Sequence, residues 1–275
     1  MKTLSVKVSV NGTVDGAHMN VYLYENSPEL LIEKRPIVII APGGGYRFKS
    51  EREADSIATQ FLSIGYNAAI LYYSVAPAVY PTALRELAFS FKFLKDNAAE
   101  FNIDPDKIVV CGFSAGAHLV ASFGTGYYRP EVTDYFHVSE DELRPAAMIL
   151  SYPVITSGEF AHRDSFDALL GPDKDDKEKL SYVSIENRVS EKTVPAFIWH
   201  TFEDNCVPLE NSLLMADSMR KAGVPFELHV FPNGQHGLSL ANHLTMSKYA
   251  TEFEPEAAQW IELCKTWLLK LIGLN

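Results

Sequence analysis

The stretch that decides how this chain folds is Lys107-Ile108-Val109-Val110-Cys111-Gly112-Phe113-Ser114-Ala115-Gly116-Ala117-His118-Leu119-Val120-Ala121. It begins as an apolar run typical of a buried strand and ends as a run that favours a helix. Glycines on both sides of Ser114 allow the backbone to reverse sharply between the two elements. G-x-S-x-G in this context predicts a nucleophile elbow that projects the Ser114 hydroxyl outward. A chance glycine-rich turn is the alternative interpretation.

Similar apolar runs recur along the chain and alternate with helical patterns. The runs predict buried strands over 37–40, 69–72, 108–110, 147–150, 196–199 and 226–230. Apolar residues with helical spacing predict helices over 54–62, 84–94 and 260–271. Two alternating segments around Asn11-Gly12 predict an antiparallel hairpin at the sheet edge. The alternation indicates the α/β class, a mostly parallel twisted sheet with helices on both faces.

Two long stretches, 124–145 and 152–194, interrupt the alternation. Long segments of this kind inside a compact domain are usually lids or binding loops, so we expect loop or small lid insertions there. The charged run 173–179 within the second stretch is expected to be a solvated surface. Because no Pro-, Gly- or Ser-rich linker divides the chain, we expect a single domain over 1–275.

Composition and charge exclude several classes of protein. With 47% hydrophobic and 21% charged residues, the chain can bury a sizeable core. Its net charge of -11 disfavours nucleic acid or an anionic membrane as partner. The start of the chain alternates polar and apolar residues, unlike a signal peptide, and three cysteines suit a reducing compartment. We therefore expect a cytoplasmic protein without a metal or organic cofactor. A homo-oligomer stays an open alternative.

A serine nucleophile requires a histidine that accepts its proton. His236 lies in a turn-rich loop directly after the last predicted strand, where this fold places its base. His243, in an expected helical stretch, is the reserve candidate. His118 follows Ser114 by one helical turn and is expected to pack beneath the elbow. His200 ends a strand but precedes the expected acid, which breaks the usual order.

The histidine in turn requires a carboxylate that orients it. The predicted strand over 196–199 runs into Thr201-Phe202-Glu203-Asp204, so an acid lies just past the strand end. Asp204 is the preferred candidate because its shorter side chain suits a fixed hydrogen bond to an imidazole. Glu203 is the alternative.

Backbone N–H donors for a tetrahedral oxyanion are the third requirement. Pro42-Gly43-Gly44-Gly45-Tyr46 directly follows the strand over 37–40, and its glycines allow close approach of a substrate. We assign the oxyanion hole to the N–H groups of Gly44, Gly45 and Ala115. A phosphate-binding loop is the alternative, but no G-K-[ST] pattern supports it.

Together these motifs resemble the α/β-hydrolase superfamily, more narrowly its bacterial esterases similar to hormone-sensitive lipase and to acetyl-xylan and feruloyl esterases. The resemblance covers nearly the whole chain and implies the α/β-hydrolase fold. The motifs on which the resemblance rests are Pro42-Gly43-Gly44-Gly45-Tyr46, Gly112-Phe113-Ser114-Ala115-Gly116-Ala117-His118-Leu119, His200 to Asp204 with Val207-Pro208, and Gly234-Gln235-His236-Gly237. Pro42 stands where the hormone-sensitive-lipase pattern has histidine, which looks more like the sugar-ester branch.

The resemblance implies a serine carboxylesterase with the triad Ser114, His236 and Asp204. Its expected partner is a small-molecule ester with a short acyl group, such as an acetylated sugar or xylo-oligosaccharide. A peptidase or amidase of the same fold, prolyl-oligopeptidase-like or arylformamidase-like, is one alternative. A non-catalytic binding protein that kept the fold is another. Five tyrosines near the motifs suit either a flat sugar-binding surface or ordinary packing, and packing is preferred: Tyr46, Tyr73, Tyr127, Tyr128 and Tyr152.

Overall fold

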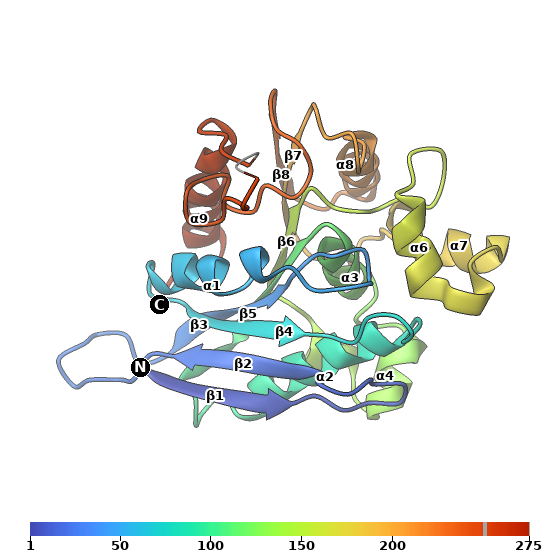
Figure 1. Ribbon diagram of the computed structural model, residues 1–275. Helices are drawn as coiled ribbons and strands as arrows, with labels where there is room; N and C mark the ends of the chain where they lie inside the picture. The colour runs from blue at the N-terminus through green and yellow to red at the C-terminus, as the bar shows by residue number, and fades with distance from the viewer. Residues whose placement is uncertain (250–251, 275) are drawn as a thin grey trace.

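The computed structural model describes residues 1–249 and 252–274, which form one eight-stranded sheet covered by helices (Figure 1). The strands are β1 Lys2–Lys7, β2 His18–Leu23, β3 Arg35–Ala41, β4 Asn67–Tyr72, β5 Ile103–Phe113, β6 Ala147–Ser151, β7 Ala196–Thr201 and β8 Phe226–Phe231. The helices are α1 Asp55–Leu62, α2 Thr82–Asp96, α3 Ala115–Gly124, α4 Pro130–Phe136, α5 Glu140–Leu143, α6 Arg163–Leu170, α7 Lys177–Val183, α8 Glu210–Ala222 and α9 Trp260–Leu271, with short 3-10 turns such as η1 Glu51–Glu53. Within this described part, no helix is long and apolar enough to cross a membrane.

The strand order is β1-β2-β4-β3-β5-β6-β7-β8. β2 is antiparallel to β1 and to β4, and the remaining pairs are parallel. All strands and helices predicted from the apolar patterns are present, and β1 and β2 form the predicted edge hairpin. The architecture confirms the expected α/β-hydrolase fold.

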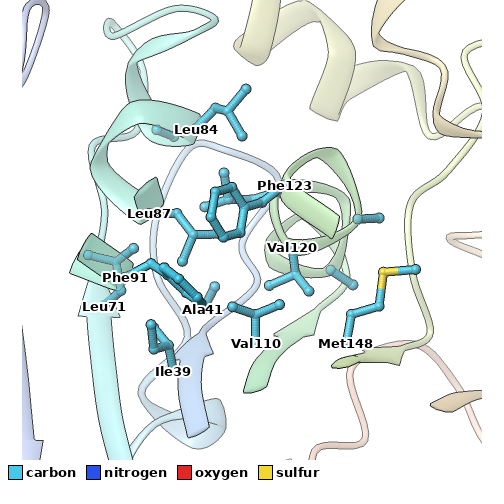
Figure 2. Close-up of a cluster of buried hydrophobic side chains, with 14 of the residues drawn as sticks. Ile39, Ala41, Leu71, Leu84, Leu87, Phe91, Val110, Val120, Phe123 and Met148 are labelled. Carbon is cyan, nitrogen blue, oxygen red and sulfur yellow. The ribbon is translucent and has the colours of Figure 1, made fainter. Parts of the chain in front are cut away.

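The central strands are buried on both faces, and successive side chains of each strand point to opposite sides. In β3, Ile37, Ile39 and Ala41 join a core with α2 and α3, whereas Val38 and Ile40 join a second core with α1 and α9. Figure 2 shows part of the first core, where side chains of α2 and α3 meet those of the central strands. The continuous apolar runs of the sequence therefore reflect two separate cores.

The two insertions contain short helices, which the sequence analysis did not predict. The segment 124–145 contains α4 and α5, and the segment 152–194 contains α6 and α7. These helices have four to eight residues, too few for a clear helical period. Strands on either side of each insertion pair in the same sheet. In Figure 1, α6 and α7 lie at the right, the side toward which the arrow of β4 points.

The first core gives a stability prediction. Leu87 of α2 is fully buried, whereas the side chain of Leu31 is 88% exposed. Leu87→Ala is expected to lower the free energy of unfolding by about 2–5 kcal/mol, because the cavity it leaves closes only partly. Leu31→Ala is the matched control and should change stability by less than about 0.5 kcal/mol. Urea unfolding of both variants measures the difference, and similar losses would contradict the described packing.

Candidate active site

The predicted elbow lies between β5 and α3. Ser114 has φ 53°, a left-handed conformation that is strained for any residue other than glycine. Its N–H donates to the carbonyl of Ser151 at 3.0 Å, which fixes the turn against β6. A Cβ on Gly116 would lie 2.2 Å from the Ala41 carbonyl oxygen, and one on Gly112 would lie 2.3 Å from the Gly116 oxygen. Both flanking positions therefore accept only glycine.

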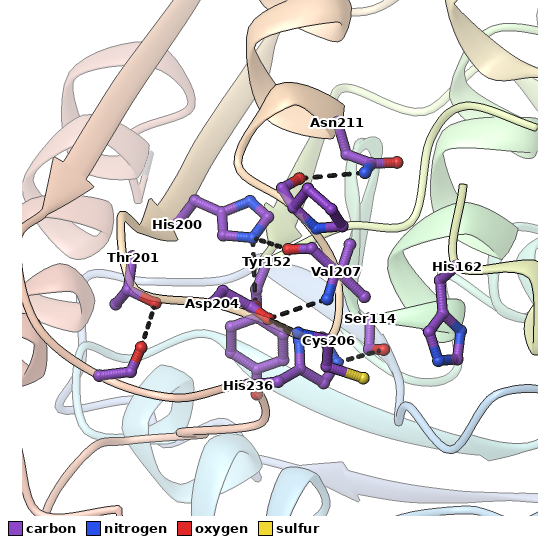
Figure 3. Close-up of polar contacts among 12 residues, drawn as sticks. Ser114, Tyr152, His162, His200, Thr201, Asp204, Cys206, Val207, Asn211 and His236 are labelled. Atoms are coloured by element: carbon purple, nitrogen blue, oxygen red, sulfur yellow. Dashed lines mark hydrogen bonds and ion pairs between the residues drawn. The ribbon is translucent and has the colours of Figure 1, made fainter. Parts of the chain in front are cut away.

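The structure brings Ser114, His236 and Asp204 together in a chain of hydrogen bonds (Figure 3). The Ser114 Oγ is 2.8 Å from His236 Nε2, and His236 Nδ1 is 2.6 Å from Asp204 Oδ2. Because a carboxylate only accepts, Nδ1 carries the imidazole proton and Nε2 is left to accept from the serine hydroxyl. This is the tautomer that a general base requires.

Asp204 is fixed by donors on both of its oxygens. Its side chain is fully buried, and Oδ1 accepts from the N–H groups of Cys206 at 3.0 Å and Val207 at 2.9 Å. Burial alone would raise the pKa of Asp204, but the hydrogen bonds with His200 and His236 outweigh it and hold the pKa well below its usual range. The carboxylate therefore stays charged opposite His236.

Sequence reasoning missed the role of His200. Its Nε2 lies 3.2 Å from Asp204 Oδ2 and 2.9 Å from the Val207 carbonyl, and its Nδ1 lies 2.8 Å from the Ser212 hydroxyl. Two acceptors at Nε2 require the proton there, so Nδ1 accepts from Ser212. The available sequence signal was a histidine near the end of an otherwise apolar strand, because a buried imidazole needs hydrogen-bond partners.

The alternative acid, Glu203, has a different place. It is exposed and accepts the Gly234 N–H at 3.2 Å, in the loop that leads to His236. Glu203 thus holds the histidine loop from outside, whereas Asp204 contacts the imidazole.

Among the described residues, His236 is the histidine bonded to Ser114 Oγ, and the other candidates considered as the base, His243 and His118, lie elsewhere. His243 is exposed and stacks on Phe253, and the helix expected around it is wrong, because the segment consists of turns. His118 is buried beneath the elbow, as predicted, 2.9 Å from the Tyr46 hydroxyl and 2.8 Å from the Val183 carbonyl. Burial lowers its pKa to about 4, so it remains neutral near pH 7.

The oxyanion candidates lie around the serine. Gly44 has φ +133°, and a Cβ there would lie 2.2 Å from the Phe48 carbonyl oxygen. Among residues 1–249 and 252–274, the N–H groups of Gly44, Gly45 and Ala115 have no hydrogen-bond acceptor. Ala115 is the first residue of α3, and the first N–H groups of a helix have no carbonyl partner within the helix. By contrast, the Gly43 N–H donates to Glu53 Oε2 at 2.7 Å.

A cleft of about 460 Å³ opens above these residues. Its lining combines the glycine loop after β3, Ser114 and His236, and the start of α6: Gly44, Gly45, Arg47, Phe48, Ser50, Arg52, Glu53, Ser114, His162, Asp164, Cys206, His236 and Gly237. Of the two insertions, the one over 152–194 therefore supplies a wall of the cleft. In the described residues, no three His, Cys, Asp or Glu side chains are grouped so that they would hold a metal ion.

His162 and Ser114 both line this cleft, and both are labelled in Figure 3. Its Nδ1 lies 2.8 Å from the Ser165 hydroxyl. Burial, and secondarily the charge of His236, lowers the pKa of His162, which favours a neutral ring with Nε2 available to a ligand.

The tyrosines near the motifs pack inside the protein. Four are buried and do not line the cleft: Tyr46, Tyr73, Tyr127 and Tyr152. Tyr128 is half-buried and contacts the Ser190 hydroxyl. The preferred interpretation as packing is confirmed for the buried four.

This chain is similar in sequence to several known proteins and in fold to several solved structures. The family model BD-FAE matches residues 19–219. The chain is 38% identical over 229 residues to endo-1,4-beta-xylanase B of Butyrivibrio fibrisolvens (81% of this chain, 35% of that protein) and 30% identical over 263 residues to an acetylxylan esterase of Xylanibacter ruminicola (93% and 50%). It thus spans half or less of the length of these curated relatives.

The crystal structure of an acetyl ester-xyloside bifunctional hydrolase from Caldicellulosiruptor lactoaceticus superposes with a TM-score of 0.80 at 37% identity, over 94% of this chain and 89% of that one.

The environment of Asp204 predicts how stability depends on pH. The pKa of Asp204 is lower in the folded protein than the value of about 3.9 in an unfolded chain, so its stabilisation is present above that value and is lost as pH falls through the folded pKa. Asp204→Asn should reduce the free energy of unfolding by on the order of 2 kcal/mol at neutral pH. The difference in free energy of unfolding between the wild type and Asp204→Asn should become smaller below about pH 4.

Urea unfolding of both proteins near neutral pH and near about pH 3 measures this gap. Glu203→Gln is the matched control, because that carboxylate is exposed. A gap for Asp204→Asn that does not change with pH would contradict the described environment.

Proposed function

The chain belongs to the BD-FAE family, and we propose that it is a serine carboxylesterase that removes short acyl groups, above all acetyl groups, from sugars and xylo-oligosaccharides. The single observation that carries this proposal is the hydrogen-bonded chain from Ser114 through His236 to Asp204 at the wall of an open cleft. A serine, a base and a buried acid in this geometry are the requirements of acyl transfer.

In the first half-reaction, Ser114 Oγ attacks the carbonyl carbon of the ester while its proton moves to His236 Nε2. The tetrahedral intermediate then collapses: the bond to the alcohol oxygen breaks, and His236 returns the proton to the departing alcohol. Asp204 keeps the imidazole oriented and stabilises its positive charge in both steps. The products are the free alcohol and an acyl group on Ser114.

In the second half-reaction, a water molecule replaces the alcohol. His236 accepts a proton from the water as its oxygen attacks the acyl carbon, and then returns the proton to Ser114 Oγ as the carboxylic acid leaves. In both half-reactions the carbonyl oxygen becomes negative. The unpaired N–H groups of Gly44, Gly45 and Ala115 are the donors that we assign to this oxygen.

The cleft supports a sugar as the alcohol part of the substrate. A volume of about 460 Å³ suits a small molecule, and the wall offers both polar groups and an exposed ring. Arg47, His162 and Asp164 present polar side chains, and Phe48 is 63% exposed. The names of two similar proteins, an acetylxylan esterase and an acetyl ester-xyloside hydrolase, point to the same chemistry.

The triad gives the first activity prediction. Ser114→Ala, His236→Ala and Asp204→Ala are each expected to lower kcat by roughly 10⁴-fold or more, because the three residues act as a unit. Initial rates on p-nitrophenyl acetate measure the loss. Glu203→Gln, which changes the neighbouring carboxylate, should retain most activity. Near-normal turnover of the Asp204 variant would remove Asp204 from the triad.

A substrate panel tests the reaction class and the substrate. Rates are compared on p-nitrophenyl acetate, butyrate and octanoate, on acetylated xylo-oligosaccharides and on an aminoacyl-anilide, with Ser114→Ala as control. Deacetylation of the oligosaccharides with little octanoate or anilide turnover is expected. Dominant anilide turnover would indicate a peptidase or amidase instead. Absence of both Ser114-dependent hydrolysis and fluorophosphonate labelling would indicate a binding protein.

A further inference from the structure

A second buried carboxylate, Glu53, lies beside the triad without belonging to it. Glu53 ends the 3-10 turn η1, and only 3% of its surface is exposed. Its Oε2 accepts the Gly43 N–H at 2.7 Å, and its Oε1 accepts the Tyr152 hydroxyl at 2.5 Å. Each oxygen of one carboxylate therefore holds a different segment of the site.

Tyr152 carries this connection on to the histidine loop. Its hydroxyl accepts the Ser239 N–H at 2.9 Å, three residues after His236. Its ring meets the His236 ring edge to face, with centroids 5.1 Å apart and an interplanar angle of 73° (Figure 3). Tyr152 also has φ 36°, an uncommon conformation for a bulky residue that persists only where the surroundings enforce it.

We propose that Glu53 is a positioning residue, which keeps the oxyanion loop and the histidine loop in place around Ser114 by binding the Gly43 N–H and the Tyr152 hydroxyl. This inference rests on the proposed esterase function. Gly43 directly precedes Gly44, so the Glu53 contact sets the orientation of the peptide that leads into the oxyanion donors. The Tyr152 contact sets the ring against which the His236 imidazole rests.

The free energy of burying Glu53 supports a functional role. Burial raises the pKa of Glu53, and the hydrogen bonds from Tyr152 and Gly43 offset this only in part. An apolar side chain of similar size would fill the same space without that cost. Among the described residues, the groups that interact electrostatically with Glu53 include Tyr152, His236, Arg52, Tyr73 and Cys111.

Glu86 offers a matched control. It is also a fully buried glutamate, and it accepts one backbone N–H and hydroxyl groups: Ser74 N–H at 2.6 Å, Ser74 Oγ at 2.5 Å and Thr13 Oγ1 at 2.8 Å. Across residues 1–249 and 252–274, none of its hydrogen bonds reaches the oxyanion loop or the triad. Substituting Glu86 therefore reports the effect of losing a buried carboxylate as such.

The experiment compares kcat and KM for p-nitrophenyl acetate in Glu53→Leu, Glu53→Gln, Tyr152→Phe and Glu86→Leu, with active sites counted by fluorophosphonate labelling. Glu53→Leu removes both acceptors and should lower kcat about 10²-fold, as expected for a displaced donor, with KM within about threefold. Tyr152→Phe removes the hydroxyl, and with it both the bond to Glu53 and the bond from the Ser239 N–H, and should lower kcat about tenfold. Glu86→Leu should keep kcat within about twofold per active site, because it touches no catalytic element.

Glu53→Gln is the conservative rescue. Its amide oxygen accepts the Gly43 N–H while its amide N–H donates to the Tyr152 oxygen, so both contacts persist with one hydrogen bond reversed. Its kcat should therefore stay within about tenfold of the wild type and above that of Glu53→Leu.

Several outcomes would overturn the positioning role. One is a Glu53→Leu or Tyr152→Phe variant with kcat within about twofold of the wild type, and another is an equal loss in Glu53→Leu and Glu86→Leu. If Glu53→Leu does not fold, the Tyr152→Phe result decides alone. A wild-type protein without Ser114-dependent hydrolysis would overturn the proposed function, and the positioning role with it. A normal wild type with normal variants would overturn the positioning role only.

Discussion

The close backbone contact between the elbow and β3 is the constraint on which the rest of the site depends. The Ala41 carbonyl at the end of β3 lies so near Gly116 of α3 that no side chain fits between them. This contact holds the carboxyl ends of β3 and β5 together. The loop after β3, with Gly44 and Gly45, is thereby brought beside Ser114, and the strained φ of Ser114 turns its hydroxyl toward that loop.

Much of the fold and the triad geometry was predictable because parallel strands place their carboxyl ends along one edge of the sheet. The elbow, the glycine loop, Asp204 and His236 each directly follow a strand that its apolar run identifies. Locating the strands therefore also located residues that are far apart in sequence. Asp204 and Ser114 are far apart in sequence but lie close together, because β5, β6 and β7 pair side by side in the sheet.

The rest was not predictable, for two physical reasons. The helices of the insertions are short, so their stability comes from packing against the core rather than from a local pattern; α6, for example, buries Phe166, Leu169 and Leu170. The partners of buried polar groups are set by long-range packing: Glu53 meets Tyr152, 99 residues away, and His200 meets Asp204 only because the chain turns after β7.

The two buried carboxylates of the site differ in a way that suits acyl transfer. Asp204 receives two backbone donors and two imidazoles, and the resulting depression of its pKa keeps negative charge where the imidazolium of His236 forms. Glu53 receives only two donors, and burial prevails and raises its pKa. Its charged form is thus disfavoured beside the oxyanion loop, where the tetrahedral intermediate itself becomes negative. Burial opposes the charged form of both carboxylates, and the hydrogen bonds around Asp204 outweigh it whereas those around Glu53 do not; because the loops supply these donors, the environment rather than the residue type separates the two groups.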